Sequence, residues 1–153
     1  MDRCQRIRSL FLDPAESYTL GEVARLTDTP VRALRREVAG GDRDAERVRG
    51  RWRFLWRQAV YVAMERWTLA EIADALGADA ARVLPPLLAL RAVTVRLPEF
   101  IILALETVAG EQRMTLDAAL HGELIDFAGT MAERMDKVAP GYREAYFFPG
   151  RPN

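Results

Sequence analysis

The sequence predicts a mainly α protein with one small β-hairpin and a helical C-terminal module. Three observations support this prediction: two segments repeat a helix-start pattern, the apolar residues after them have helical spacing, and residues 47–54 alternate around a glycine. The chain has 153 residues, of which 50% are hydrophobic, and a formal net charge of zero. This composition excludes a chain that stays disordered and predicts one packed domain or two small modules.

The two helix starts are similar in sequence and lie 49 residues apart. In each, a threonine (Thr19 or Thr68) can cap the free amides of the first turn. A glutamate three residues later (Glu22 or Glu71) can reach back to the amide of that threonine. We therefore predict helices that begin directly after Thr19 and Thr68, and we assign both glutamates a structural role.

A second helix is expected over residues 31–38, with Thr29 as its cap and Pro30 at its first position. Its apolar residues fall on one face and its basic residues on the other: Val31, Leu34 and Val38 against Arg32, Arg35 and Arg36. Gly40 and Gly41 end this helix. Residues 47–54 then predict a β-hairpin around Gly50, in which Trp52 and Phe54 pack against the protein.

The next elements are expected to be helices at residues 55–66, 69–76 and 80–90, the last of them kinked by two prolines. Residues 92–97 alternate between apolar and polar, which predicts a half-buried strand. Because a lone strand cannot satisfy its own backbone groups, it must pair with the hairpin or with the same strand of a second chain. Helices follow at residues 99–112 and after Thr115, the last with one apolar stripe: Leu116, Leu120, Leu124, Phe127 and Met131.

The residue inventory argues against an enzyme. Nucleophile, base and metal chemistry draw on His, Cys and Lys, and the chain has one of each. Cys4 lies near a terminus that we expect to be mobile, and His121 has no second ligand nearby in sequence. We expect no cofactor, no metal and no disulfide. The single cysteine and the absence of a long apolar run predict a cytoplasmic protein without a membrane segment.

Charge is distributed unevenly. Residues 1–66 carry a net charge of +4 and residues 67–153 a net charge of −4. The stretch from residue 32 to residue 57 contains nine arginines and four acidic residues. A helix-turn-helix pattern that coincides with such a basic stretch favours contact with DNA over a merely solvated surface.

Residues 18–27 together with 31–36 resemble the opening of MerR-type regulators and of excisionase-type winged helix-turn-helix domains, and Gly50-Arg51-Trp52-Arg53-Phe54 is similar to the excisionase wing. The resemblance covers about residues 17–60. It implies a transcription regulator that binds a specific site on double-stranded DNA, with the second helix reading bases and the wing gripping the backbone. The implied DNA-binding residues are Thr29, Arg32, Arg35, Arg36, Arg47, Arg49, Arg51 and Arg53.

Residues 92–135 are similar to ribbon-helix-helix modules, a resemblance that implies groove contacts from Ala92, Thr94 and Arg96. Since this half is net acidic, we expect it to serve dimerisation or packing instead. The predicted division is therefore a winged helix-turn-helix at 14–66, a helical dimerisation and partner module at 67–138, and an aromatic tail at 139–153.

The tail aromatics either pack onto the same chain or bind a partner through Tyr142, Tyr146, Phe147 and Phe148. The small size, the acidic second half and this tail suit an antitoxin-type autorepressor that forms a homodimer and holds a toxin. The alternative function is a protein-protein interaction adaptor that uses the helix-turn-helix only as a scaffold.

Overall fold

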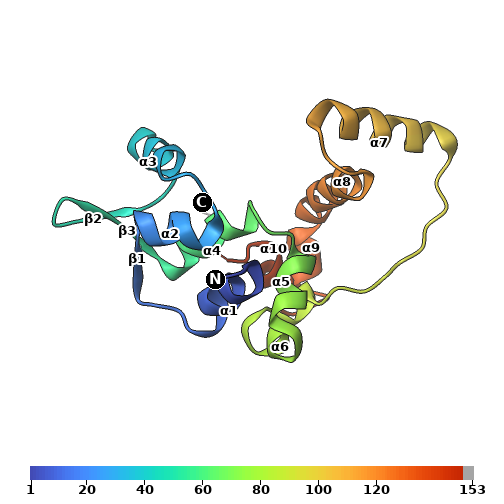
Figure 1. Cartoon of the computed structure of the whole chain (residues 1–153). Helices are drawn as coiled ribbons and strands as arrows, with labels where there is room; N and C mark the ends of the chain where they lie inside the picture. Colours follow the sequence, from blue (N-terminus) through green and yellow to red (C-terminus); the bar gives the residue numbers. More distant parts are fainter. Residues whose placement is uncertain (150–153) are drawn as a thin grey trace. The chain divides into compact units, whose positions relative to one another are not determined.

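The computed structural model describes residues 1–149, which form two compact units (Figure 1). Among the described residues, unit 1 comprises 1–89 and 147–149, and unit 2 comprises 90–146. The protein is mainly helical with a small three-stranded antiparallel sheet, as the sequence predicts. The boundary between the two units lies between residues 89 and 90, whereas the sequence predicted a boundary between residues 66 and 67. Helix α5 packs on α1, so both belong to the same unit.

Unit 1 contains most of the short elements. In chain order they are α1 (Arg3–Leu12), β1 (Ser17–Thr19), α2 (Leu20–Thr27), α3 (Val31–Gly40), β2 (Glu46–Val48), β3 (Arg51–Leu55), α4 (Trp56–Met64), α5 (Leu69–Leu76), the 3-10 turn η1 (Gly77–Asp79), α6 (Ala80–Val83) and the 3-10 turn η2 (Pro86–Leu88). The long helix predicted at 80–90 is thus a short helix and a 3-10 turn, because Pro85 and Pro86 interrupt the amide ladder.

Both predicted capping boxes are confirmed. Thr19 Oγ1 accepts from the amide of Glu22 at 3.2 Å, and Glu22 Oε2 accepts from the amide of Thr19 at 2.6 Å. The corresponding distances at Thr68 and Glu71 are 3.2 and 2.9 Å. These glutamates are therefore structural, and they fix where α2 and α5 begin.

The hairpin is also confirmed, and it gains a third strand. The sheet order is β1-β3-β2, with Tyr18 opposite Phe54 and Arg47 opposite Trp52. Strand β1 has only three residues, so it is defined by its pairing with β3 rather than by a pattern of its own. Arg49 and Gly50 form the turn with φ of 49° and 78°, the double positive φ of a type I′ hairpin.

The N-terminal segment forms α1, which corrects the expectation of a mobile terminus at Cys4. Asp2 caps this helix through the amide of Gln5 at 2.7 Å. Its apolar face is almost completely buried: Ile7, Leu10 and Phe11. Cys4 lies on α1 with its Sγ 3.7 Å from the carbonyl oxygen of Ala75 on α5.

The connection between α2 and α3 differs from the predicted one. Thr29 does not cap α3, because its side chain turns inward and its hydroxyl lies 2.8 Å from that of Thr27. Pro30 occupies the N-cap position and offers no side-chain hydrogen bond. Asp28 takes the left-handed conformation, with φ 56°, that ends α2.

Unit 2 contains α7 (Glu99–Gln112), α8 (Leu116–Thr130), α9 (Ala132–Asp136) and α10 (Tyr142–Tyr146). Thr115 caps α8 as predicted, by accepting from the amide of Ala118 at 3.2 Å. The tail prediction missed α10. The strand predicted at 92–97 is not formed: residues 90–97 make no backbone–backbone hydrogen bond within the described residues.

The predicted apolar stripe of α8 is only partly covered within the described residues, where Leu120 packs against the core of unit 2. The core of unit 2 consists of Leu105, Ala109 and Ala119, whereas Leu124 and Phe127 remain 54% and 63% exposed. None of the helices in residues 1–149 combines the length and the apolar run needed to cross a membrane.

Candidate nucleic-acid interface

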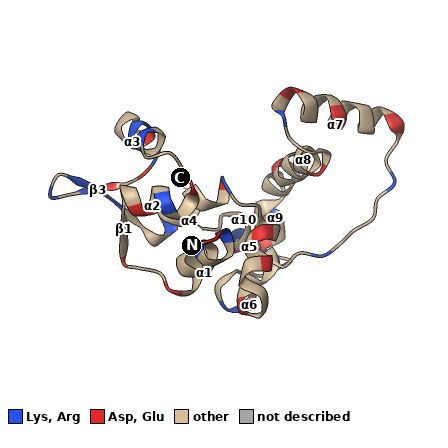
Figure 2. Ribbon diagram, in the orientation of Figure 1, with Lys and Arg blue, Asp and Glu red and all other residues tan. Residues whose placement is uncertain are grey.

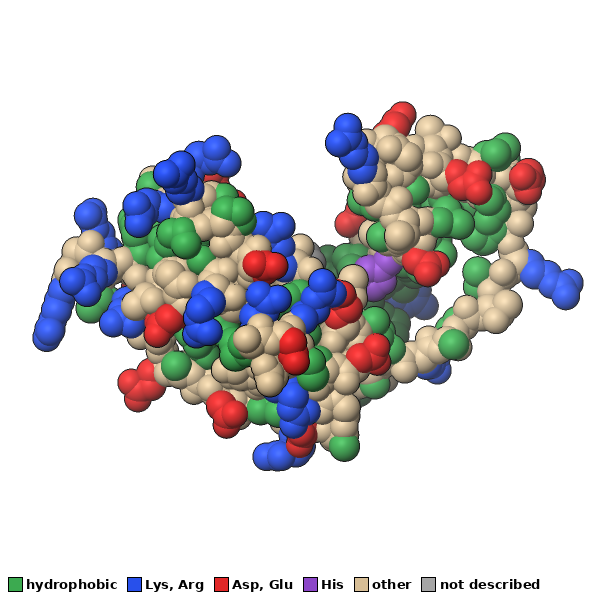
Figure 3. Space-filling view, viewed as in Figure 1, with side chains coloured by type: hydrophobic (Ala, Val, Ile, Leu, Met, Phe, Trp, Pro, Cys, Tyr) green, Lys and Arg blue, Asp and Glu red, His purple; other side chains and the backbone are tan. Residues whose placement is uncertain are grey.

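Helix α3 has two sharply different faces. Leu34 and Val38 point into the core with 0% and 5% exposure and anchor the helix on unit 1. Arg32, Arg35 and Arg36 lie on the exposed side, and none of them forms an ion pair among the described residues. Figure 2 shows these basic segments on α3, and Figure 3 shows basic side chains gathered over α3 and over the hairpin.

The hairpin also has two faces, because opposite residues of an antiparallel pair point to the same side. Arg51 and Arg53 share the outward face with Val48, and the turn residue Arg49 extends it. These four side chains line an open hollow of about 550 Å³. Three guanidinium groups that line one open hollow suit a ligand with several negative charges.

Arg47 belongs to the other face of the hairpin. Its guanidinium lies 5.5 Å from the centre of the Trp52 ring, directly across the strand pair. Trp52 is half-buried and Phe54 is fully buried, so this face packs toward the core, as predicted for both aromatics. The structure therefore separates Arg47 from the cluster of Arg49, Arg51 and Arg53.

Arg53 is less available than its neighbours on β3. It is half-buried and lies opposite Glu46 in the register of the two strands. Its charge also helps to lower the pKa of Glu22, an effect in which the hydrogen bond from the Thr19 amide is the larger cause. On this face of the hairpin the exposed cations are Arg49 and Arg51.

Arg43 lies in the same basic stretch of sequence but is held inside the unit. It bonds Glu37 at 2.8 Å and Glu65 at 2.6 Å, and its guanidinium lies 5.9 Å from the centre of the Tyr61 ring. Burial alone would lower the pKa of Arg43, but the hydrogen bonds that Arg43 donates to Glu65 and Glu37, together with the charges of these carboxylates, outweigh burial and raise the pKa. Arg43 thus ties the loop after α3 to α4 and positions the basic face.

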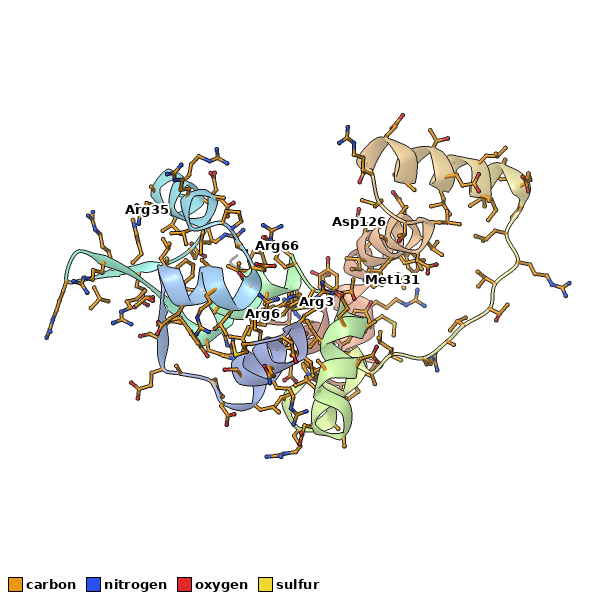
Figure 4. All side chains as sticks on the ribbon, in the orientation of Figure 1. Arg3, Arg6, Arg35, Arg66, Asp126 and Met131 are labelled. Carbon is orange, nitrogen blue, oxygen red and sulfur yellow. The ribbon has the colours of Figure 1, made fainter. Side chains whose placement is uncertain are left out.

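The structure does not favour the predicted contact between Thr29 and DNA. Its exposure is 8%, and its hydroxyl accepts a hydrogen bond from Arg66 Nε at 3.3 Å. A buried hydroxyl with two partners cannot meet a large ligand at the surface. Figure 4 shows Arg35 on α3, apart from Arg66.

The aromatic residues of the tail are used within the chain. The Phe148 ring packs edge-on against Trp56 of unit 1, with centroids 6.4 Å apart. Within unit 2, the Tyr142 hydroxyl donates to a carbonyl of α8 at 3.0 Å, and Tyr146 lies so close to α8 that a Cβ at Gly129 would clash. A partner-binding role for these residues and for Phe147 stays a prediction.

Two features of this surface were missed by sequence reasoning. Val31 was assigned to the buried side of α3, yet it is 43% exposed, in contrast to Leu34 and Val38. The burial of Arg43 has no signal in a run of arginines, because it depends on Glu65, 22 residues away.

Among residues 1–149, no three His, Cys, Asp or Glu side chains gather as a metal site would require. His121 is exposed on α8. Comparisons with protein-family models, with curated proteins and with solved structures found no match to this chain.

Proposed function

We propose that this protein is a transcription regulator that binds a specific site on double-stranded DNA as a homodimer. In this proposal α2, α3 and the β2–β3 hairpin act as a winged helix-turn-helix. Helix α3 enters the major groove and the hairpin lies against the neighbouring phosphates. The observation that supports it most is the outer face of α3, where Arg32, Arg35 and Arg36 are exposed without an acidic partner in the described chain.

The chemistry of these side chains fits the groove. An α-helix fits the major groove of B-DNA, where a guanidinium can bind the O6 and N7 atoms of a guanine together. Arg49 and Arg51 are exposed on one face of the hairpin and suit phosphate oxygens. Figure 3 shows basic side chains over the hairpin and over α3 at one end of unit 1. Salt-sensitive affinity should come from these cations, because neutralising phosphates releases bound counterions.

The dimer is supported by unit 2. Its exposed large apolar residues are numerous: Leu90, Val93, Val95, Phe100, Leu103, Met114, Leu116, Leu124, Phe127 and Val138. Residues 92–97 also keep their alternating pattern without a strand to pair with. A second copy could supply both the missing strand and the missing apolar cover, and two copies would read two half-sites.

The test is a salt titration of binding to a duplex that the full chain selects from a random library, measured by fluorescence anisotropy. With about six phosphate contacts, affinity should fall about a thousandfold between roughly 50 and 200 mM salt. The triple variant R32A/R35A/R36A should lose preference for the selected duplex. Its melting temperature should stay nearly unchanged, because these side chains are on the surface.

Arg82→Ala is the matched control, because the Arg82 side chain is 78% exposed on α6, away from α3 and the hairpin in sequence. It should bind the selected duplex like the unchanged protein. If no duplex is enriched, or if the control loses affinity as strongly as the triple variant, the proposal is wrong.

The alternative is a protein-protein adaptor, favoured by the same exposed apolar residues of unit 2. An antitoxin-type autorepressor would combine both roles, with unit 2 holding a toxin and unit 1 the operator. An adaptor alone would show no salt-dependent DNA affinity, so the same titration separates it from the proposed regulator.

A further inference from the structure

Val31 is the one large apolar residue of α3 that is exposed. It is 43% exposed, and it belongs neither to the core of unit 1 nor to the partly buried side chains that pack against that core. A single exposed valine is ordinary on a protein surface. What distinguishes Val31 is its place in the first turn of α3, directly before Arg32 and one helical turn before Arg35.

This position has a defined chemistry if α3 lies in the major groove. The N-terminal residues of a recognition helix meet the base edges first. An arginine there can hold guanine, and a small apolar side chain can pack on the C5-methyl group of a pyrimidine. In duplex DNA that methyl belongs either to thymine or to 5-methylcytosine.

We infer that Val31 contacts the C5-methyl group of a 5-methylpyrimidine, close to a guanine bound by Arg35. Four residues of α-helix span about 6 Å, and successive base pairs lie about 3.4 Å apart, so the two bases lie within about two base pairs of each other. The inference rests on the proposed function and adds the substrate feature that Val31 selects.

The expected effect is modest and specific. Burying one methyl group corresponds to about a fourfold change in affinity. Replacing one thymine by deoxyuracil removes only the methyl and keeps every hydrogen-bonding group. At one thymine of the selected site, this exchange should weaken binding by the full chain about fourfold, and binding by Val31→Ala should not respond to it.

The site is selected twice from random libraries, once with ordinary cytosine and once with 5-methylcytosine throughout. Deoxyuracil is then placed at each thymine in turn, and cytosine at each 5-methylcytosine. Sensitivity at a thymine assigns thymine as the ligand, and sensitivity at a 5-methylcytosine assigns a methylated site. Leu87→Ala is the control, because Leu87 is 50% exposed on η2, outside α3 and the hairpin, and should leave the discrimination unchanged.

Specific binding in which no single methyl matters would overturn the inference and leave the proposed function standing. Discrimination that Val31→Ala retains would also overturn it, since another side chain would then read the methyl. If neither library yields an enriched duplex, the proposed function fails and the inference fails with it.

Discussion

The two units of this protein are both helical, but they use their apolar residues differently. Within its described residues, unit 1 buries nineteen apolar side chains in one core, although none of its helices is longer than ten residues. Unit 2 has the two longest helices, α7 with 14 and α8 with 15 residues, yet its core holds only three buried side chains. Helix length and apolar content do not make a core unless another element covers each apolar face.

The geometry of α7 explains the difference. Its apolar residues surround the helix, so that Leu105 is buried against α8 while Phe100 and Leu103 point outward with 72% and 54% exposure. One neighbouring helix covers one side only. Unit 1 therefore covers its own apolar faces, whereas unit 2 would gain most from the proposed second copy, and the following variants test this contrast.

The largest effect should come from a matched pair of phenylalanines. Phe54 is 0% exposed in unit 1, and Phe127 is 63% exposed in unit 2. Phe54→Ala should lower the free energy of unfolding by about 3–5 kcal/mol, because it leaves a cavity. Phe127→Ala should change it by less than about 0.5 kcal/mol in dilute protein, since no buried contact is lost. Chemical denaturation measures both, and equal losses would refute the contrast.

The next effect concerns the proposed dimer. The double variant F100S/F127S should raise the dimer dissociation constant tenfold or more, because aromatic anchors dominate protein interfaces. Analytical ultracentrifugation over a concentration series measures it. Leu87→Ser is the control, because Leu87 is 50% exposed but belongs to unit 1. A double variant that dimerises like the control would place the interface elsewhere.

A smaller effect should separate the helix caps of the two units. Thr68→Ala removes one half of a reciprocal pair with Glu71 and should lower the free energy of unfolding by about 1 kcal/mol. Thr115 makes a single bond to the amide of Ala118, so Thr115→Ala should cost less and fray only the start of α8. Amide hydrogen exchange distinguishes the global loss from the local one.

The smallest effect is the response of unit 1 to acid. Hydrogen bonds from the amides of Thr19 and Thr68 lower the pKa of Glu22 and of Glu71 below the ordinary value of 4.5. A depressed folded pKa means that each glutamate stabilises the fold fully above pH 4.5 and loses this contribution as the pH falls through the lowered value.

The variant E22Q/E71Q should therefore lose less stability than the unchanged protein between pH 6 and about pH 3. Thermal melting across this range measures the difference. Equal acid sensitivity in both proteins would mean that these capping carboxylates contribute nothing to the pH dependence.

The sequence predicted the elements that depend on neighbours in the chain. Thr19 with Glu22, Thr68 with Glu71, and the turn at Gly50 are settled over three or four residues, and all three were correct. The sequence did not predict strand β1, and it predicted a strand at 92–97 that is not formed. Both errors have the same reason. A strand exists only where another strand lies beside it, and the pattern of a segment does not reveal whether such a partner is present.

The sequence indicated which side chains the candidate site contains, but not which contacts they make with one another. The alternation of residues 51–54 correctly separated Arg51 and Arg53 from Trp52 and Phe54. It could not show that Arg47 stacks on Trp52, because that contact depends on the register between two strands. Thr29 was assigned to the surface by analogy with a cap, and packing against Thr27 turned it inward.

At the turn of the hairpin, thermal stability and affinity for a polyanion favour different residues. Arg49 adopts φ 49°, a conformation that asparagine tolerates better than arginine. An asparagine at position 49 should give a hairpin that resists heat better and grips polyanions less firmly. Selection of this protein for thermal stability alone would thus favour the loss of the positive charge at the hairpin turn.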